Sequence, residues 1–244
     1  MTLLKDAMQY LLELKEPTVI EINGQNYSTR SLTHVKHPVP APLRVNTLSG
    51  LCEYILSAFD AEAFSGILIH VVSPTEVVMV SNLMNDGQRE TYVVANAMLP
   101  DFRFGQFIDI ENFIISVQSC FVPNEDSAKI LKLVGNIKDT NIKTFGDDGV
   151  TQSVTAKSGI ATVDEVPVPN PINLAPFRTF IEVEQPESDF IIRIRKSDSR
   201  HTEPGLVCAL FEADGGAWKI DAMANIRGYL EDRLNGVAGV VIID

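Results

Sequence analysis

Cysteine and histidine are scarce in this sequence of 244 residues, which contains 3 cysteines and 4 histidines. No CxxC pair occurs, so the sequence offers neither the usual spacing of a zinc site nor a dithiol redox motif. An odd number of cysteines and the lack of an export signal predict a reducing compartment. Cys52, Cys120 and Cys208 lie far apart in apolar runs, and we expect them to be small core residues.

Long apolar runs and nucleotide-binding motifs are also missing. No segment approaches the roughly 20 consecutive apolar residues that cross a membrane. Lys5 and Asp6 occupy the place where a signal peptide would need its apolar stretch. We therefore expect a protein of the cytoplasm that makes no membrane contact. The absence of a Walker pattern and of a GxGxxG run leaves generic nucleotide binding without support.

Negative charge outweighs positive charge, since 32 Asp and Glu face 20 Lys and Arg, for a formal net charge of −12. Phosphate binding relies on Lys and Arg that displace counterions, so this balance disfavours broad binding to nucleic acid. A local basic strip or mimicry of nucleic acid remains compatible with the charge, but a solvated surface explains it. Hydrophobic residues at 45% and charged residues at 21% are typical of ordered globular domains.

The N-terminal half of the sequence alternates helical and extended patterns. We expect an amphipathic helix over about the first fifteen residues, ended by Pro17. A hairpin should follow over 18–29, because Asn23-Gly24 between two extended runs favours a type I′ turn. Further helices are expected over 48–59 with Thr47 as N-cap, after Asp109 as N-cap, and over 125–137. Strands are expected over 66–72, 77–83 and 91–95.

The composition shifts from Thr140 onward to Gly, Asp, Thr, Val and Pro, which predicts short strands and then an extended crossing. Strands are expected over 177–183 and 190–195. A hairpin over 206–213 and 217–220 is expected across Asp214-Gly215-Gly216, with a helix that begins right after the glycines as the competing interpretation. A helix after Asp221 and an apolar strand over 237–243 should complete the chain.

These patterns predict an α+β fold with antiparallel sheets. Helices should be concentrated in the N-terminal half, and the C-terminal part should contain a hairpin-helix-strand unit. We expect a helix-rich α+β half over 1–140 and a strand-rich half over 141–244, or one continuous domain.

No catalytic residue, metal site or cofactor is predicted. His34 and His37 are closely spaced but have no third ligand within sequence reach. Asp214, Gly215, Gly216, Trp218 and Lys219 are binding candidates, because an acidic turn followed by a lysine is similar to metal-dependent nucleases. Ala217 stands where such a site needs a second acidic residue, so a tight turn beside a core tryptophan is favoured, with a backbone anion nest as the alternative.

Arg178, Arg193 and Arg195 are the other binding candidates. With Glu182 and Glu184 they form an alternating-charge set on expected neighbouring strands, and cross-strand ion pairs on a solvated sheet face explain it. If that face lined a groove, the arginines could bind phosphate or an acidic partner.

Three stretches of the C-terminal half resemble a known family: Asp147 to Gln152, Pro176 to Phe180 with Glu184 to Pro186, and Leu210 to Trp218. They are similar to the YfdQ-like proteins of tailed phages and prophages. The Asn23-Gly24 hairpin and the helix start at Thr47 to Leu51 add to the resemblance. The resemblance implies an early or accessory phage gene product in the cytoplasm of the host bacterium, and it carries over no catalytic residue.

We therefore expect a non-enzymatic protein that binds a host factor, a nucleotide signal or a phage partner. It should work as a homo-oligomer, with Val237 to Ile243 as one self-association element. Two alternatives stay open. One is a metal-dependent phosphodiester hydrolase that uses some of Glu182, Glu184, Glu212 and Asp214. The other is a structural component of the virion or of its assembly.

Overall fold

The computed structural model describes residues 2–13, 17–22, 24–29, 31, 39–60, 66–84, 87–137, 144–147, 152–158, 162–197 and 205–244. The chain divides into two compact units, Met1–Pro40 and Ala41–Asp244. The predicted division near residue 140 stays a prediction. Among the described helices, none is both long and apolar enough to cross a membrane.

The first unit contains one helix and one hairpin. Helix α1 spans Thr2–Glu13, and strands β1 (Val19–Ile22) and β2 (Gln25–Ser28) pair antiparallel with Ile22 opposite Gln25. Gly24 has a φ of 75°, as the two-residue turn requires. The predicted helix and hairpin are both confirmed.

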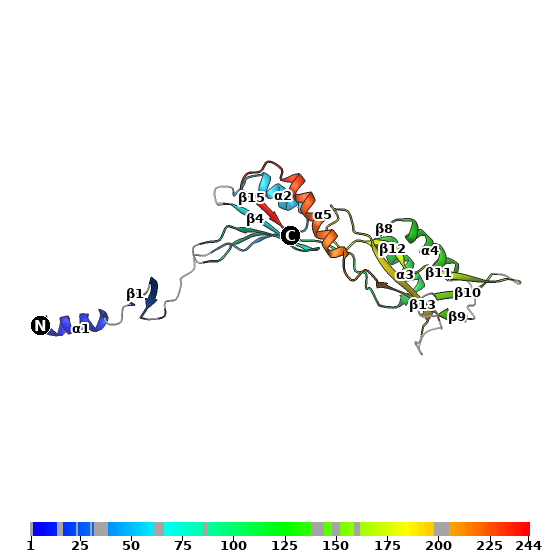
Figure 1. The fold of residues 1–244 in the computed structure, drawn as a ribbon, viewed down its shortest axis with the longest axis horizontal. Coiled ribbons are helices and arrows are strands. Elements are labelled where there is room, and N and C mark those ends of the chain that lie inside the picture. Colours follow the sequence, from blue (N-terminus) through cyan, green and yellow to red (C-terminus); the bar gives the residue numbers. More distant parts are fainter. Residues whose placement is uncertain are drawn as a thin grey trace. The chain divides into compact units, whose positions relative to one another are not determined.

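The second unit begins with a five-stranded sheet, the first sheet, ordered β15-β4-β5-β6-β3. Strands β4, β5 and β6 form an antiparallel meander, and β3 and β15 each add in parallel at an edge. Helices α2 (Leu48–Leu56) and α5 (Trp218–Arg233) lie together on one side of this sheet (Figure 1). The strands are β3 (Leu43–Val45), β4 (Ile67–Ser73), β5 (Glu76–Ser81), β6 (Thr91–Asn96) and β15 (Val240–Ile243).

The helix side of the first sheet is its core. Ile69, Met79 and Val93 are fully buried there against side chains of both helices, including Leu51 and Ile226. The predicted N-cap is confirmed, because the Thr47 side chain accepts a hydrogen bond from Gly50 N at 3.1 Å.

The predicted extent of the second helix is wrong at its C-terminal end. The helix ends at Leu56, and Ala58 then adopts a φ of 52°, which turns the chain away from the helical path. Phe59 is consequently 83% exposed and is not part of the buried helix face.

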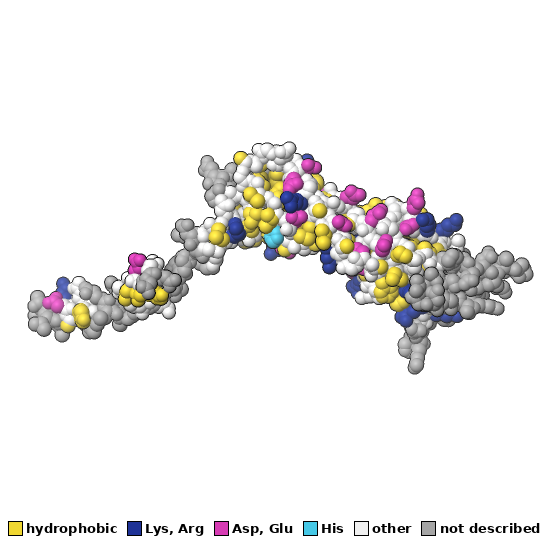
Figure 2. All heavy atoms as spheres, in the orientation of Figure 1, with side chains coloured by type: hydrophobic (Ala, Val, Ile, Leu, Met, Phe, Trp, Pro, Cys, Tyr) yellow, Lys and Arg dark blue, Asp and Glu magenta, His cyan; other side chains and the backbone are white. Residues whose placement is uncertain are grey.

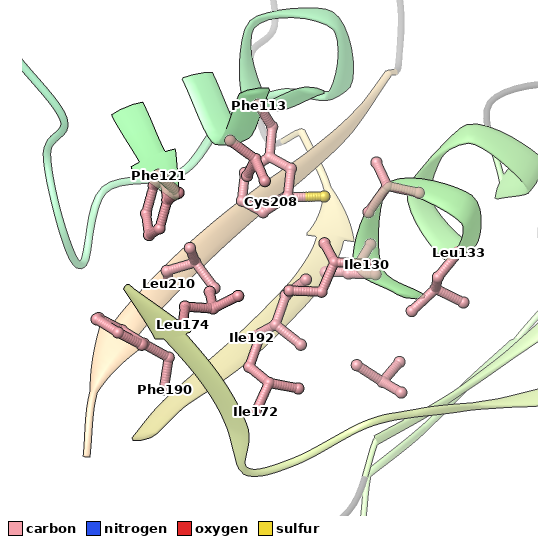
Figure 3. Close-up of a cluster of buried hydrophobic side chains, with 14 of the residues drawn as sticks. Phe113, Phe121, Ile130, Leu133, Ile172, Leu174, Phe190, Ile192, Cys208 and Leu210 are labelled. Atoms are coloured by element: carbon pink, nitrogen blue, oxygen red, sulfur yellow. The ribbon is translucent and has the colours of Figure 1, made fainter. Parts of the chain in front are cut away.

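The second five-stranded sheet, the second sheet, is ordered β7-β14-β13-β12-β8 and is antiparallel throughout. Helices α3 (Ile110–Cys120) and α4 (Glu125–Ile137) pack on one face of it, and Asp109 caps α3 as predicted. Figure 3 shows the core between them, where Phe113 and Ile130 from the helices meet Leu174, Ile192 and Leu210 from the sheet. The strands are β7 (Ile108–Asp109), β8 (Phe121–Val122), β12 (Ile172–Pro176), β13 (Ser188–Lys196) and β14 (Leu206–Glu212).

A three-stranded antiparallel sheet, ordered β11-β10-β9, lies between α4 and β12 in sequence. It consists of β9 (Thr144–Asp147), β10 (Gln152–Ser158) and β11 (Thr162–Val168). The α+β fold with antiparallel sheets is confirmed.

Two strand predictions in the C-terminal half are wrong. Residues 177–187 form a loop, and β13 pairs with β12 at 172–176. Residues 218–220 belong to α5, so the competing interpretation, a helix directly after the glycines, is confirmed. The reason is the turn at 214–217, where Gly215 and Gly216 have φ values of 65° and 85° and lead straight into the helix.

Candidate interaction surface

Arg178 lies at the centre of a buried cluster instead of on a solvated sheet face. Its side chain is 7% exposed, and its Nη1 donates a hydrogen bond to Glu212 Oε1 at 2.8 Å. Its other terminal nitrogen donates to Ser188 Oγ. The guanidinium lies 3.9 Å from the ring centre of Trp218 and 5.7 Å from that of Phe190. Burial lowers the pKa of Arg178 to about 10, against the opposing effect of the Glu212 and Asp214 carboxylates.

Asp214 completes this arginine cluster from the turn before α5. Its carboxylate accepts hydrogen bonds from Ser188 Oγ at 2.7 Å, Gly216 N at 3.0 Å and Trp218 N at 3.4 Å. Burial acts to raise the pKa of Asp214, but these hydrogen bonds and the Arg178 charge outweigh it and hold the pKa below its usual value. The Gly216 amide, which an anion nest would need, therefore binds the protein's own carboxylate.

The loop over 177–187 is closed by Gln185, a buried residue that is not among the predicted site residues. Gln185 Oε1 accepts from Arg178 N at 3.1 Å and from Thr179 N at 3.3 Å. Gln185 Nε2 donates to Phe180 O at 2.9 Å and to Val183 O at 3.0 Å. All hydrogen-bonding capacity of this amide is used to hold the loop, and no local pattern in the sequence indicates this role.

The same loop reaches the first sheet. Thr179 Oγ1 donates to Pro74 O at 2.6 Å, and Phe180 and Val183 join the core of the first sheet. The Glu182 carboxylate accepts from Leu48 N at 2.8 Å and Ser49 N at 2.7 Å, so it caps the N-terminus of α2. The loop thus places Arg178 beside Phe190 of one core and Phe180 within the other.

The carboxylates that a phosphodiester hydrolase would use are consequently committed to other contacts. Glu182 caps α2, Glu212 pairs with Arg178, and Asp214 holds the turn before α5. Glu184 is exposed on the loop. Within the described ranges, no group of three or more His, Cys, Asp or Glu side chains could hold a metal ion. His34, His37 and His201 lie outside the described residues.

A shallow polar pocket lies at the start of α4. Asn124 Oδ1 accepts from Ser127 N at 2.8 Å, and Asp126 Oδ2 accepts from Asn173 N at 3.0 Å. The polar groups of this pocket thus stabilise the start of α4 and hold β12, so their role is structural. Glu125 and Glu187 complete its lining.

The three free cysteines are buried, as expected. Burial raises the pKa of the Cys52 thiol to about 11 and that of the Cys208 thiol to about 12. Such thiols remain protonated near neutral pH and behave as core residues.

The open face of the second sheet carries arginine and aromatic side chains. Arg193 lies opposite Ala209 and Arg195 opposite Val207 on β13 and β14. The Arg195 guanidinium lies 4.0 Å from the ring centre of Phe107, which packs edge-on against Phe211 at 6.2 Å. These arginines are therefore apart from the Arg178 cluster. Lys219 is exposed on α5, with its Nζ 6.0 Å from the ring centre of Trp218.

The open face of the first sheet is aliphatic. Along β5, Val77 and Met79 are buried under the helices, whereas Val78 and Val80 point to the opposite side and are half-buried. Cross-strand partners share a face, which aligns Val78 with Val94 and with His70. We define the open face as Leu68, His70, Val78, Val80, Val94, Val241 and Ile243.

This open face ends at β15 with its most exposed members. Val241 is 57% exposed and Ile243 is 40% exposed, and they lie beside Leu68 and His70. Among the described residues His70 is the only histidine, and Figure 2 shows it in cyan with hydrophobic side chains in yellow gathered beside it. Arg44 and Glu76 stand at the rim of the face, on β3 and at the start of β5.

No family model matches this chain, and neither the curated proteins nor the solved structures contain a match to it. The resemblance to the YfdQ-like phage proteins stays a prediction.

Proposed function

We propose that this protein is a non-catalytic accessory protein of phage or prophage, which works in the host cytoplasm as an oligomer and binds a protein partner. The open face of the first sheet carries this proposal. It presents aliphatic side chains from four adjacent strands, while α2 and α5 cover the opposite face. Contiguous exposed apolar patches on a globular protein mark interaction sites.

The partner that fits this surface is a protein with an apolar face of its own. Branched aliphatic side chains on a sheet offer dispersion contacts and water release, but few hydrogen-bond donors for phosphate or sugar. The formal net charge of −12 also disfavours nucleic acid as the partner.

The polar cluster around Arg178 supports binding over catalysis. Both terminal nitrogens of its guanidinium, the Asp214 carboxylate and the Gln185 amide bond to other groups of the protein, and Arg178 Nε is buried without a hydrogen-bond partner. A catalytic group must instead reach a substrate atom in an accessible site. We therefore assign this cluster to joining the two cores.

The test is native mass spectrometry of the chain purified from cells in which its phage or prophage genes are expressed. The wild-type chain should carry a protein partner in fixed stoichiometry. The double variant Val78→Lys/Val94→Lys places two charges in the middle of the open face and should lose that partner. The matched control Ile181→Lys changes a residue that is 76% exposed on the 177–187 loop and should retain the partner.

Two results would contradict the proposal. One is a wild-type chain that never carries a partner, and the other is a partner that stays bound to the Val78→Lys/Val94→Lys variant. Large closed assemblies in the same spectra would favour the structural virion component instead.

A further inference from the structure

The two five-stranded sheets have four edge strands, and natural sheets protect such edges against pairing with another chain. Two of the edges, β7 (Ile108–Asp109) and β8 (Phe121–Val122), are only 2 residues long. A third edge, β3, carries the exposed Arg44 and follows Pro42. Short length, a charge and proline are three of the known protective features.

The fourth edge, β15, is the longest of the four, with 4 residues. Its residues are Val240, Val241, Ile242 and Ile243, so it contains neither a charge nor a proline. Asp244, which directly follows the strand, is paired with Arg227 of α5. Arg227 Nη1 donates to Asp244 Oδ1 at 2.9 Å, and Arg227 Nε donates to Glu231 Oε1 at 2.8 Å. A second copy of this acidic chain would thus meet little repulsion at this edge.

The parallel pairing of β15 with β4 fixes which backbone groups point outward. The Gly239 carbonyl accepts from Ile67 N at 2.9 Å, so it points toward β4. In a parallel ladder this direction alternates along the strand. Val241 and Ile243 therefore direct their backbone groups toward β4, and Ile242 directs its N–H and C=O away from the sheet.

We propose that β15 pairs antiparallel with β15 of a second copy of this chain. The two-fold axis stands perpendicular to the sheet and passes between the two Ile242 residues, which exchange both backbone hydrogen bonds. Val241 of each copy then lies opposite Ile243 of the other, and the helices of both copies lie on the same side. The two five-stranded sheets become one continuous sheet.

This inference rests on the oligomeric form of the proposed function and names the partner surface. A two-fold pair is isologous, so the same strand forms both sides of the interface and must be complementary to a copy of itself. An uncharged aliphatic strand meets this condition. Pairing at β15 also joins the open faces of the two copies, because Val241 and Ile243 belong to that face. The partner-binding surface would then be twice as wide.

Cysteine crosslinking tests the register. Residues opposite each other in an antiparallel pair have Cβ atoms roughly 4.5–5.5 Å apart, near enough for a disulfide after small shifts. A mixture of full-length Val241→Cys and Ile243→Cys chains should form a disulfide-linked heterodimer on mild oxidation. Each variant alone should stay unlinked, and the native cysteines are buried and should add no background. Equal crosslinking of either single variant with itself would overturn this register.

Charge exchange tests the edge itself by native mass spectrometry. Wild type should be dimeric, and Val241→Lys/Ile243→Lys should be monomeric because four ammonium groups would meet at the axis. Val241→Glu/Ile243→Glu should be monomeric too, and mixing the two variants should restore a heterodimer. Ile220→Lys, a control at a residue that is 74% exposed on α5, should stay dimeric. A wild-type monomer, or a dimer in both charged variants, would overturn the proposal.

The open-face variant separates the two proposals. Val78→Lys/Val94→Lys should lose the protein partner and remain a dimer, since neither residue is at the β15 edge. If that variant instead becomes monomeric while Val241→Lys/Ile243→Lys stays dimeric, the copies pack face to face and edge pairing is wrong. A dimer that carries no partner would support the edge pairing and contradict the proposed function.

Discussion

The two five-stranded sheets share a layer plan and differ in the face that their helices leave uncovered. In each sheet two helices cover one face with an aliphatic or aromatic core. The first sheet presents Val78, Val80 and Val94 on its other face, whereas the second presents Arg193 and Arg195, of which Arg195 lies over the Phe107 ring. The same architecture therefore yields one surface suited to apolar contact and one that carries two arginines, one of them stacked on an aromatic ring.

The loop over 177–187 belongs to both sheets and shows how differently each is joined to it. On the second sheet the contact is ionic and aromatic, from Arg178 to Glu212 and to the ring of Phe190. On the first sheet it is a helix cap from Glu182 and apolar contact from Phe180. Removing either contact should therefore destabilise one sheet more than the other.

The largest expected effect contrasts the two faces of one strand. Met79 is fully buried on β5 and its neighbour Val78 points to the open face. Met79→Lys buries an unpaired charge and removes core packing, so we expect a loss of more than about 4 kcal/mol in the free energy of unfolding or no folding at all. Val78→Lys should cost less than about 1 kcal/mol in the isolated chain.

Urea unfolding followed by circular dichroism measures both. Similar losses for the two variants would show that the open face is covered in the free chain, and the comparison of the faces would fail.

Sequence patterns predicted well those features that depend on residues close together in the chain, such as helix caps and tight turns. The Thr47 and Asp109 caps lie within three residues of the amides they bind, and the Asn23-Gly24 turn needs only its own backbone preferences. Alternation along β13 was also readable, because Phe190, Ile192 and Ile194 are all buried on one face.

The errors arose where distant contacts decide. Residues 177–183 carry an apolar alternation like that of a strand, but Phe180 and Val183 are buried by the first sheet and Gln185 binds the loop amides. Helix α5 has no side-chain cap at Ala217, so the sequence suggested the later start at Asp221.

The site was predicted only in part for the same reason. Arg178 and Asp214 were candidates, but the partners that bury the arginine, Ser188, Glu212 and Trp218, follow it by 10 to 40 residues. No periodicity shows that these segments converge. The position of β15 at a sheet edge was likewise invisible, since a four-residue apolar run suits a central strand equally well.

The second expected effect contrasts two arginines of the second-sheet region. Arg178→Ala leaves Glu212 and Asp214 without their cation and opens a cavity beside Trp218, so we expect a loss of about 3–5 kcal/mol in the free energy of unfolding. Arg195→Ala removes an exposed cation–aromatic contact with Phe107 and should cost only about 0.5–1 kcal/mol. Equal losses of unfolding free energy in chemical denaturation would mean that burial does not distinguish the contributions of Arg178 and Arg195.

The third effect concerns the attachment of the loop to the first sheet. Glu182→Ala removes the acceptor of Leu48 N and Ser49 N, so α2 loses a cap and we expect a cost of about 1–2 kcal/mol. Glu184→Ala, two residues away with an exposed side chain, is the matched control and should change the free energy of unfolding by less than about 0.5 kcal/mol. Faster amide exchange in the first turn of α2, seen only in Glu182→Ala, would identify the cause. Unchanged exchange there would contradict the capping role.

The smallest effect is a pH dependence on the side of the second sheet. The folded pKa of Asp214 lies below its ordinary value of 3.8, so its charged form stabilises the fold. This stabilisation is fully present above pH 3.8 and is lost as the pH falls further through the lowered folded pKa.

Asp214→Asn should therefore cost about 1 kcal/mol near neutral pH, where the wild type keeps charge-assisted hydrogen bonds from Ser188 and Gly216. Below pH 3.8 the gap between the two chains should narrow as wild type loses stability faster. Asp232→Asn, at an exposed position near the end of α5, should not reproduce this convergence. A constant gap between wild type and Asp214→Asn across thermal unfolding from pH 7 to pH 3 would mean that the carboxylate charge does not hold the turn, and that the arginine cluster is stabilised by packing alone.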